Sequence, residues 1–125
     1  MSGPRTGSPN PDLVVEHIVP LPHFTGTEPC HNRPDPFFHD TYRQDQPEVR
    51  AALWECRHCP LAPVCLVWAL ANPILAREGI WGATTPRQRK ALRTKVIARV
   101  GAANVDDTYR AAYATAVTKL HPQGQ

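Results

Sequence analysis

Four cysteines are the residues of this chain whose type and spacing most directly suggest chemistry. Cys56, Cys59 and Cys65 lie within ten residues of one another, and Cys30 lies well upstream. Two thiolates separated by two residues can reach one metal centre, because the intervening turn brings both side chains to the same side. Pro60 follows the close pair and interrupts a helix there, which frees the chain to wrap around a site. Cys30 would then tie an irregular upstream segment to the helical core.

The spacing of the cysteines is compatible with three interpretations. Ordinary buried thiols are one, because cysteine is among the most buried residue types, although such a cluster is hard to obtain by chance in a short chain. Structural zinc is the second, but its ligands usually come as two close pairs, whereas this chain has one pair and two single cysteines. An iron–sulfur cluster held by four thiolates is the third. The spacing alone does not separate zinc from iron–sulfur, and the adjacent His31 and His58 have the spacing of loop residues rather than of ligands.

The pair Cys56-x2-Cys59 also has the spacing that thiol–disulfide oxidoreductases use. No strand–helix–strand pattern surrounds the pair, and both thiols are better used as ligands. The chain contains neither a glycine-rich phosphate loop nor a recognisable catalytic triad. We therefore predict that the protein is not an enzyme, and we keep disulfide reduction by a metal-free form as the alternative.

The elements that must position the cysteines are predicted to be short helices bounded by proline and glycine. Apolar residues at helical spacing predict helices over about 47–59, 63–71, 86–100 and 104–120. The segment Thr85-Pro86-Arg87-Gln88 is a capping box with proline at the first helical position, and Gly101 ends the helix that it opens. Strand signals are weak throughout, so the expected class is all-α, a small bundle of short helices.

Length, charge and composition limit the classes of protein to which this chain can belong. A chain of 125 residues has room for one domain, which excludes a barrel enzyme or a doubly wound fold with a substrate domain. Residues 1–50 carry a net charge of −3 and residues 51–125 one of +6, and eight of the 14 prolines fall in the first 36 residues. Residues 1–27 show no sustained period, so we expect a flexible or extended, proline-rich arm. Its apolar stretches Leu13-Val14-Val15 and Ile18-Val19 could still dock and give some order. No apolar run is long enough for a membrane span and no signal-peptide core is visible, so we expect a cytoplasmic protein with reduced thiols.

Taken together, the motifs resemble those of the WhiB-like (Wbl) transcription regulators of actinobacteria and their phages. They occur in the order and at about the distances of that family: Cys30, Asp35-Pro36-Phe37-Phe38, Cys56-Arg57-His58-Cys59-Pro60, Val64-Cys65-Leu66-Val67-Trp68-Ala69-Leu70, Gly79-Ile80-Trp81-Gly82 and a basic helix. The resemblance implies a cluster-binding domain over 28–100 that includes the basic helix 86–100. The arm 1–27 precedes this domain, and a helical extension over 101–125 follows it.

The resemblance also implies a [4Fe–4S] cluster with the helices wrapped around it. The implied ligands are Cys30, Cys56, Cys59 and Cys65. In several family members the cluster reacts with oxygen and nitric oxide, which implies a redox- or nitric-oxide-responsive regulator. A core of about 70 residues is marginal on hydrophobic burial alone, so the cluster would act as a staple. The apolar side chains that either shield the cluster or simply pack in the core are Trp54, Trp68, Leu61 and Phe38.

The partners implied by the resemblance are region 4 of the primary sigma factor, in the RNA polymerase holoenzyme, and promoter DNA. No membrane and no small-molecule substrate are expected. The partner-binding residues are predicted to be Phe37, Phe38, Gly79, Ile80, Trp81 and Gly82. Trp81, on a glycine-flanked turn, is either an exposed interface anchor or a side chain folded back onto the core. The DNA-binding residues are predicted to be Arg87, Arg89, Lys90, Arg93, Lys95 and Arg99, chiefly through phosphate contacts, with a solvated helix surface as the alternative.

The chain departs from the family pattern at two points. Ala83 stands where the family has a second glycine after Gly-Ile-Trp-Gly, and an alanine there is unfavourable if the position requires a positive φ. The basic segment also lacks an Arg-Gly-Arg-Pro-type minor-groove hook, so that mode of DNA binding is not expected.

Overall fold

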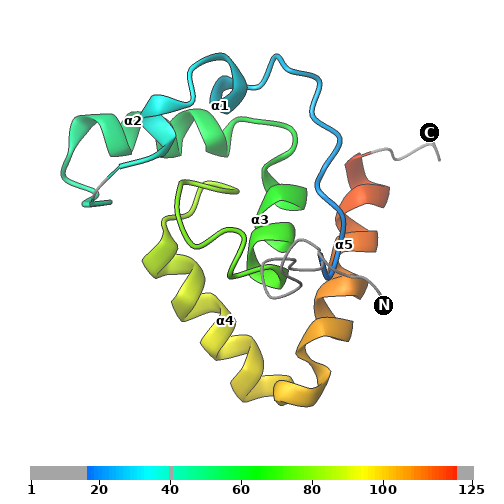
Figure 1. Cartoon of the computed structure of the whole chain (residues 1–125). Coiled ribbons are helices and arrows are strands. Elements are labelled where there is room, and N and C mark those ends of the chain that lie inside the picture. Colours follow the sequence, from blue (N-terminus) through cyan, green and yellow to red (C-terminus); the bar gives the residue numbers. More distant parts are fainter. Residues whose placement is uncertain (1–16, 40, 121–125) are drawn as a thin grey trace, which may run out of the picture.

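The chain folds into short helices, described here from a computed structural model over residues 17–39 and 41–120. The elements are α1 (Pro29–Asn32), the 3-10 helix η2 (Asp35–Phe37), α2 (Pro47–Arg57), α3 (Ala62–Ala71), α4 (Pro86–Val100), the 3-10 helix η3 (Ala102–Asn104) and α5 (Val105–Leu120) (Figure 1). Within these ranges the only β-type pairing is a single bridge between Trp81 and Thr84. The all-α class is confirmed, whereas helices wrapped around a cluster remain a prediction. No helix in the described part of the chain is long and apolar enough to cross a membrane.

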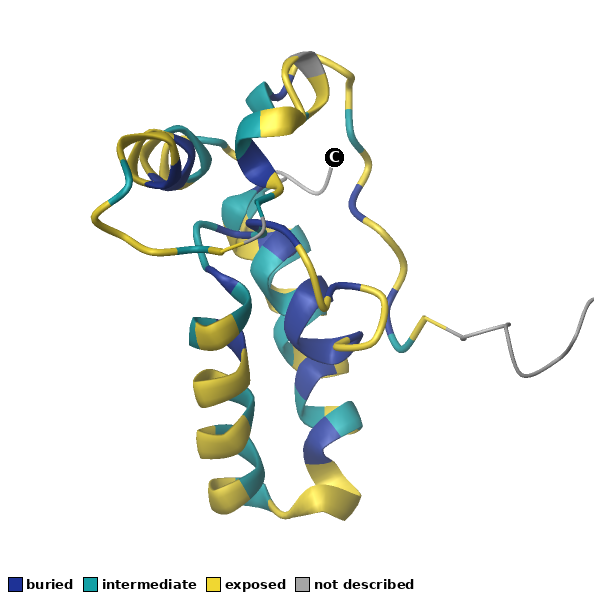
Figure 2. Ribbon diagram, turned by 60° about the vertical axis from the view of Figure 1, so that its left-hand side comes forward, coloured by how far each residue is buried: buried dark blue, intermediate teal, exposed yellow. Residues whose placement is uncertain are grey.

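Helix α3 is the central element of the arrangement. It packs against both α4 and α5, which diverge from the connection at 101–104, while α1 and α2 lie at the opposite end of the molecule (Figure 1). Helix α5, which the sequence placed in a C-terminal extension, therefore packs directly on α3. Exposed residues follow the side of α4 that is turned away from the rest of the molecule (Figure 2).

The helix boundaries follow from proline, glycine and capping residues, as predicted. Helices α2, α3 and α4 each have proline in their first two positions, where the missing N–H has no intrahelical partner to lose. At the start of α4, the Gln88 N–H donates to Thr85 Oγ1 over 3.3 Å and the Thr85 N–H donates to Gln88 Oε1 over 2.9 Å. The predicted capping box is thus confirmed. Gly101, at φ 89°, ends α4.

Two hydrophobic clusters form the interior. The larger one joins the N-terminal segment, α3 and α5, and its buried members are Val19, Trp68, Ala69, Leu70, Ala71, Ala76, Val105 and Tyr109. The smaller one joins η2, α2 and the turn before α4, and its buried members are Phe37, Val49, Ala52, Leu53 and Ile80. Cys30 and Cys56 pack against the smaller cluster. These two cysteines therefore lie at the edge of the smaller cluster.

The part of the predicted arm that the structure describes, residues 17–27, is docked on the helices. Val19 is buried in the larger cluster, and the Ile18 N–H donates to Asn72 Oδ1 over 2.7 Å. The Trp68 Nε1–H donates to His17 Nδ1 over 3.2 Å. The docking that the apolar pair Ile18-Val19 made possible is therefore observed. It occurs because Val19 packs in the larger cluster and Asn72 hydrogen-bonds the irregular backbone at Ile18 and Val19. Residues 1–16 lie outside the described residues.

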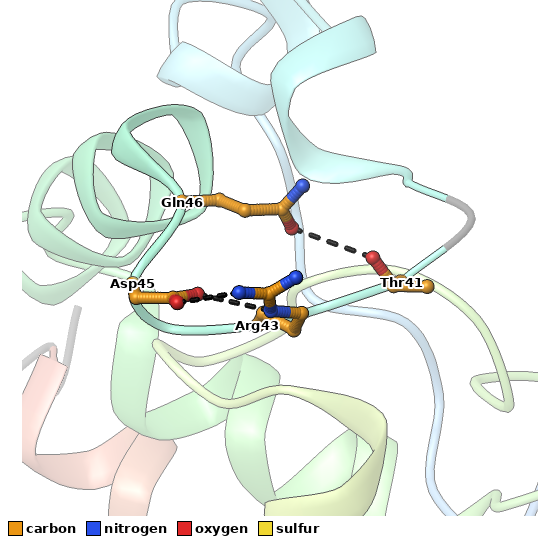
Figure 3. A network of polar contacts seen from close by, with 4 residues as sticks. All are labelled: Thr41, Arg43, Asp45 and Gln46. Atoms are coloured by element: carbon orange, nitrogen blue, oxygen red, sulfur yellow. Dashed lines mark hydrogen bonds and ion pairs between the residues drawn. The ribbon is translucent and has the colours of Figure 1, made fainter.

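The loop that leads into α2 is held by its own polar side chains (Figure 3). Arg43 forms an ion pair with Asp45, with 2.6 Å between Nη2 and Oδ2, and the Thr41 hydroxyl donates to Gln46 Oε1 over 3.4 Å. Both partners of the ion pair are solvent-exposed, so the pair contributes little to stability. We assign this loop a local ordering role only.

Candidate metal centre

The four cysteines come from four separate places in the fold and line one pocket. Cys30 lies in α1, Cys56 in the last turn of α2, Cys59 in the link that follows, and Cys65 in α3. The remaining wall of the pocket is formed by Phe24, Pro29, Phe37, Ala62, Ile80, Trp81 and Gly82. The predicted convergence of the four thiols is therefore observed. Their role as ligands stays a prediction.

Local backbone hydrogen bonds turn the chain sharply between Cys56 and Cys65. The Cys59 N–H donates to the Cys56 carbonyl over 3.1 Å, and the Ala62 N–H donates to the Cys59 carbonyl over 3.0 Å. The Cys65 N–H then donates to the Leu61 carbonyl over 2.8 Å as α3 begins. These tight turns bring three cysteines to one pocket within ten residues.

Two anchors hold the segment that carries Cys30. The carboxylate of Glu28 accepts hydrogen bonds from the Thr25 and Gly26 backbone N–H groups and from the Thr25 hydroxyl. These donors, the Thr25 N–H above all, hold the pKa of Glu28 at about 2. On the other side of Cys30, the Arg33 guanidinium bonds both carboxylate oxygens of Glu55 in α2, at 2.9 and 3.1 Å. The upstream cysteine is thus tied to the helix that carries Cys56.

The predicted shielding residues are not the ones that line the pocket. Trp54 and Phe38 are 58% and 49% exposed and lie outside it, because their positions point toward solvent. Trp68 is buried in the larger cluster. Phe24 and Trp81 take the shielding positions instead. Phe24 lies in a segment without periodicity, so no sequence pattern pointed to it.

The two histidines next to cysteines do not line the pocket. His31 lies in the short helix α1 and not in a loop, whereas His58 follows the end of α2. His58 Nδ1 lies 2.8 Å from the Trp54 carbonyl oxygen, and its ring stacks on the Trp54 ring with centroids 4.1 Å apart. The His31 ring packs against Phe24, with centroids 4.4 Å apart. Both rings therefore have other partners.

The pocket is small, with a volume of about 20 Å³. Among the residues that the structure describes, no three His, Cys, Asp or Glu side chains are placed to hold one metal ion between them. The donor set is chemically suited to a metal–thiolate group, since four cysteines line a pocket whose other lining residues are almost wholly apolar. Because the pocket is this small, binding of a cluster would require the residues that line it to move apart.

Burial raises the pKa of three of the pocket thiols and so favours their protonated form. Burial raises the pKa of Cys30 to about 11, with the neighbouring Cys56 and Cys59 adding to the shift. Burial also raises the pKa of Cys65 and of Cys56, the latter opposed by the Ala83 backbone N–H. Metal binding at these sulfurs would consequently release protons.

The turn that carries Gly79-Ile80-Trp81-Gly82 closes one side of the pocket. The Ile80 N–H donates to the Phe37 carbonyl over 2.8 Å, and the Gly79 N–H donates to the Tyr42 hydroxyl over 2.9 Å. At the far end, the Ala83 N–H donates to the sulfur of Cys56 over 2.9 Å. The turn is therefore bonded to η2, to the loop before α2 and to a candidate ligand. Sequence reasoning singled out the turn but not its contact with Cys56.

The predicted partner-binding residues are brought together beside the pocket, but most are not at the surface. Phe37 and Ile80 are 1% and 4% exposed, and both glycines of the turn are buried. Trp81 is half-buried and packs on Trp68 with ring centroids 4.9 Å apart, so it folds back onto the core. Phe38 is the exposed member of the set. A role for these residues in binding a partner stays a prediction.

Ala83 has a φ of 61°, the left-handed conformation that disfavours a side chain. The sequence-based concern about this position is therefore justified. We expect Ala83→Gly to raise the free energy of unfolding by about 0.5–1 kcal/mol, because glycine relieves this strain at a smaller entropic cost. Urea unfolding of the full chain would measure the change. Ala98→Gly, on the exposed face of α4, is the matched control and should destabilise by about 1 kcal/mol; equal effects of both substitutions would contradict the argument.

The basic side chains of α4 divide into two groups. Arg87, Lys90, Lys95 and Arg99 are exposed. Arg93 is half-buried, donates to the Leu70 carbonyl over 2.6 Å and lies over the Tyr109 ring, 5.7 Å from its centroid. Arg89 is only 5% exposed, and its guanidinium donates to the carbonyls of Ala76, Gly79 and Thr84. Its inclusion among the DNA-binding residues was wrong, because those carbonyls already occupy its donors inside the protein.

The model of a protein family described as transcription factor WhiB matches residues 25–92. The chain belongs to the WhiB family. The matched range holds all four cysteines, the glycine-flanked turn and the start of α4, so the resemblance inferred from the motifs is confirmed.

Two curated relatives are similar to part of this chain. They are the transcriptional regulator WhiB4 of two Mycobacterium tuberculosis strains, CDC 1551 / Oshkosh and H37Rv. Each is 46% identical over 43 residues, which is 34% of this chain and 35% of the relative. The match thus spans about a third of the length of these curated relatives. No solved structure gives a significant match to this chain.

Proposed function

We propose that the protein is a redox- or nitric-oxide-responsive transcription regulator that holds a [4Fe–4S] cluster on its four cysteines. The convergence of Cys30, Cys56, Cys59 and Cys65 on one apolar pocket is the observation that carries this proposal. Such a cluster is held by four thiolates and supplies one-electron redox chemistry when bound. The surrounding residues exclude water from it and order the segments that carry the ligands. We propose no catalytic reaction, in keeping with the transcriptional regulators to which the chain is similar.

The proposed protein partner is region 4 of the primary sigma factor, within RNA polymerase holoenzyme. The exposed ring of Phe38 supports this part of the proposal, because an aromatic side chain at the surface is a typical interface anchor. The Phe38 ring lies against the Gly79-Ile80-Trp81-Gly82 turn, since a Cβ built on Gly79 would fall 2.6 Å from it. A partner at this place would contact the wall of the cysteine pocket. The cluster could then control the interaction by ordering that wall.

Promoter DNA is the second proposed partner, contacted through the outer face of α4. Arg87, Lys90, Lys95 and Arg99 are exposed on this helix and form no ion pair with a described carboxylate. Unpaired surface cations attract phosphate in a salt-dependent manner without reading sequence. The proposed contact is therefore with the DNA backbone.

Metal analysis after anaerobic purification is the experiment that tests the proposed function. We expect a brown protein with about four irons per chain. The iron-loaded form, but not the metal-free form, should retain the C-terminal domain of the sigma factor on a column. Phe38→Ala should weaken this retention, whereas Trp54→Ala, an equally exposed aromatic outside the pocket, should not.

Other outcomes of the same preparation identify the alternatives. A colourless protein with zinc and no iron would replace the cluster by a zinc-stapled interaction module. Disulfide reduction by the iron-loaded protein would point to Cys56 and Cys59 as a redox-active pair and would overturn the regulator proposal.

A further inference from the structure

We propose that Arg89 is a positioning residue that holds the backbone amide of Ala83 on the sulfur of Cys56, and that it thereby sets the reduction potential of the cluster. The inference rests on the proposed function, because it requires a cluster on Cys56. It assigns a role to a buried cation that the sequence placed among the DNA contacts.

The side chain of Arg89 joins both ends of the segment that carries the turn. Its Nη2 donates to the carbonyls of Ala76 and Gly79, at 2.9 and 2.8 Å. Its Nη1 donates to the carbonyl of Thr84 over 2.7 Å. The bonds come from two separate nitrogens of a rigid planar fork, whereas a lysine presents its three N–H donors from one nitrogen and does not reproduce this geometry. Arg89 therefore holds the two ends of the segment 76–84 close together through these hydrogen bonds.

The position of the Ala83 amide depends on this closure. The Ala83 N–H donates to Cys56 Sγ over 2.9 Å from a residue whose φ of 61° is unfavourable for alanine. An unfavourable backbone conformation persists only where the surroundings hold it. Arg89 donates a hydrogen bond to the carbonyl of Thr84, the residue that follows Ala83, and this bond holds the Ala83 amide in place.

A hydrogen bond to a ligand sulfur acts on the charge of the site. An N–H donor stabilises negative charge on the sulfur, and reduction adds an electron to the cluster that the sulfur binds. The Ala83 amide therefore favours the reduced form and raises the reduction potential. Arg89 itself lies close enough to Cys56 for their charges to interact, although its pKa is lowered to about 10 by burial. A test must separate this direct charge effect from positioning.

The comparison of Arg89→Lys with Arg89→Met in the full-length, iron-loaded chain makes that separation. If Arg89 acts by positioning, both variants shift the midpoint potential to more negative values. Neither side chain reproduces the hydrogen bonds from two guanidinium nitrogens to the three carbonyls. If Arg89 acts by charge alone, Arg89→Lys keeps the wild-type potential and the proposal is overturned. Hydrogen exchange at the Ala83 amide of the same iron-loaded chains is an independent readout, and we expect it to quicken about tenfold in both variants.

A backbone ester at position 83, introduced with the hydroxy-acid analogue of alanine, replaces the N–H donor by an oxygen and leaves every side chain unchanged. This variant tests the proposal even if the Arg89 variants do not fold. We expect it to bind iron fully and to have a more negative midpoint potential. Ala83→Gly keeps the donor and the left-handed backbone, so its potential should match the wild type. An ester variant with the wild-type potential would overturn the proposal, whereas a wild-type chain that takes up no iron would refute the proposed function instead.

Discussion

Replacing Cys30 with alanine is expected to abolish iron binding and to unfold the part of the protein built from α1, η2 and α2. A metal–thiolate site contributes on the order of 10 kcal/mol to a small fold, which exceeds what burial alone supplies here. Cys30 is the proposed ligand that connects the upstream segment to the pocket, and it packs against the smaller hydrophobic cluster. Iron analysis and far-ultraviolet circular dichroism of the purified variant measure the two losses.

His58→Ala is the matched control for the cysteine variant. His58 lies beside Cys59 in sequence, is exposed and does not line the pocket. Its replacement should leave the iron content and helix content at wild-type values. A Cys30→Ala protein that retains about four irons per chain and native helicity would show that the pocket is not the cluster site.

Gly82→Ala is expected to lower the free energy of unfolding by about 3 kcal/mol, the combined cost of overpacking and of a side chain at positive φ. A Cβ at this position would lie 2.5 Å from the Cα and Cβ of Leu66, and these atoms belong to α3 and cannot rotate away. The turn would have to withdraw from α3, and the Ala83 amide would leave the sulfur of Cys56. Chemical denaturation and iron uptake of the same variant are the measurements.

Gly26→Ala separates the two contributions to that loss. Gly26 also has a positive φ, of 92°, but a Cβ there would meet nothing within 4 Å. We expect a cost of about 1 kcal/mol from backbone strain alone. If Gly82→Ala costs no more than Gly26→Ala, close packing of the turn on α3 is not what holds it.

Local signals in the sequence accounted for most of the helical architecture. Proline at the first helical positions and the capping box at Thr85 place the helix starts, because they act within a few residues and do not depend on tertiary contacts. The four cysteines line one pocket, although no three of the described thiols are placed to hold one metal ion. The short helix α1 was not predicted, because four residues are too few to show a period.

The errors arose where tertiary contacts decide the role of a side chain. Arg89 and Arg93 share an arc of α4 with Val96, Ile97 and Val100, all of which are at least half-buried. That arrangement was the available signal that these two arginines face inward, and the count of basic residues concealed it. The pocket-lining role of Phe24 gave no such signal, since it depends on how an irregular segment crosses the cysteines.

Two adjacent positions of the turn place different limits on sequence change. At position 82 the limit is volume, because any side chain meets the backbone of α3. At position 83 the limit is backbone conformation, because φ is 61° and the side chain is only partly buried. Homologous chains with the same turn should therefore accept glycine, asparagine or aspartate at position 83, which adopt left-handed conformations readily, and should exclude valine and isoleucine.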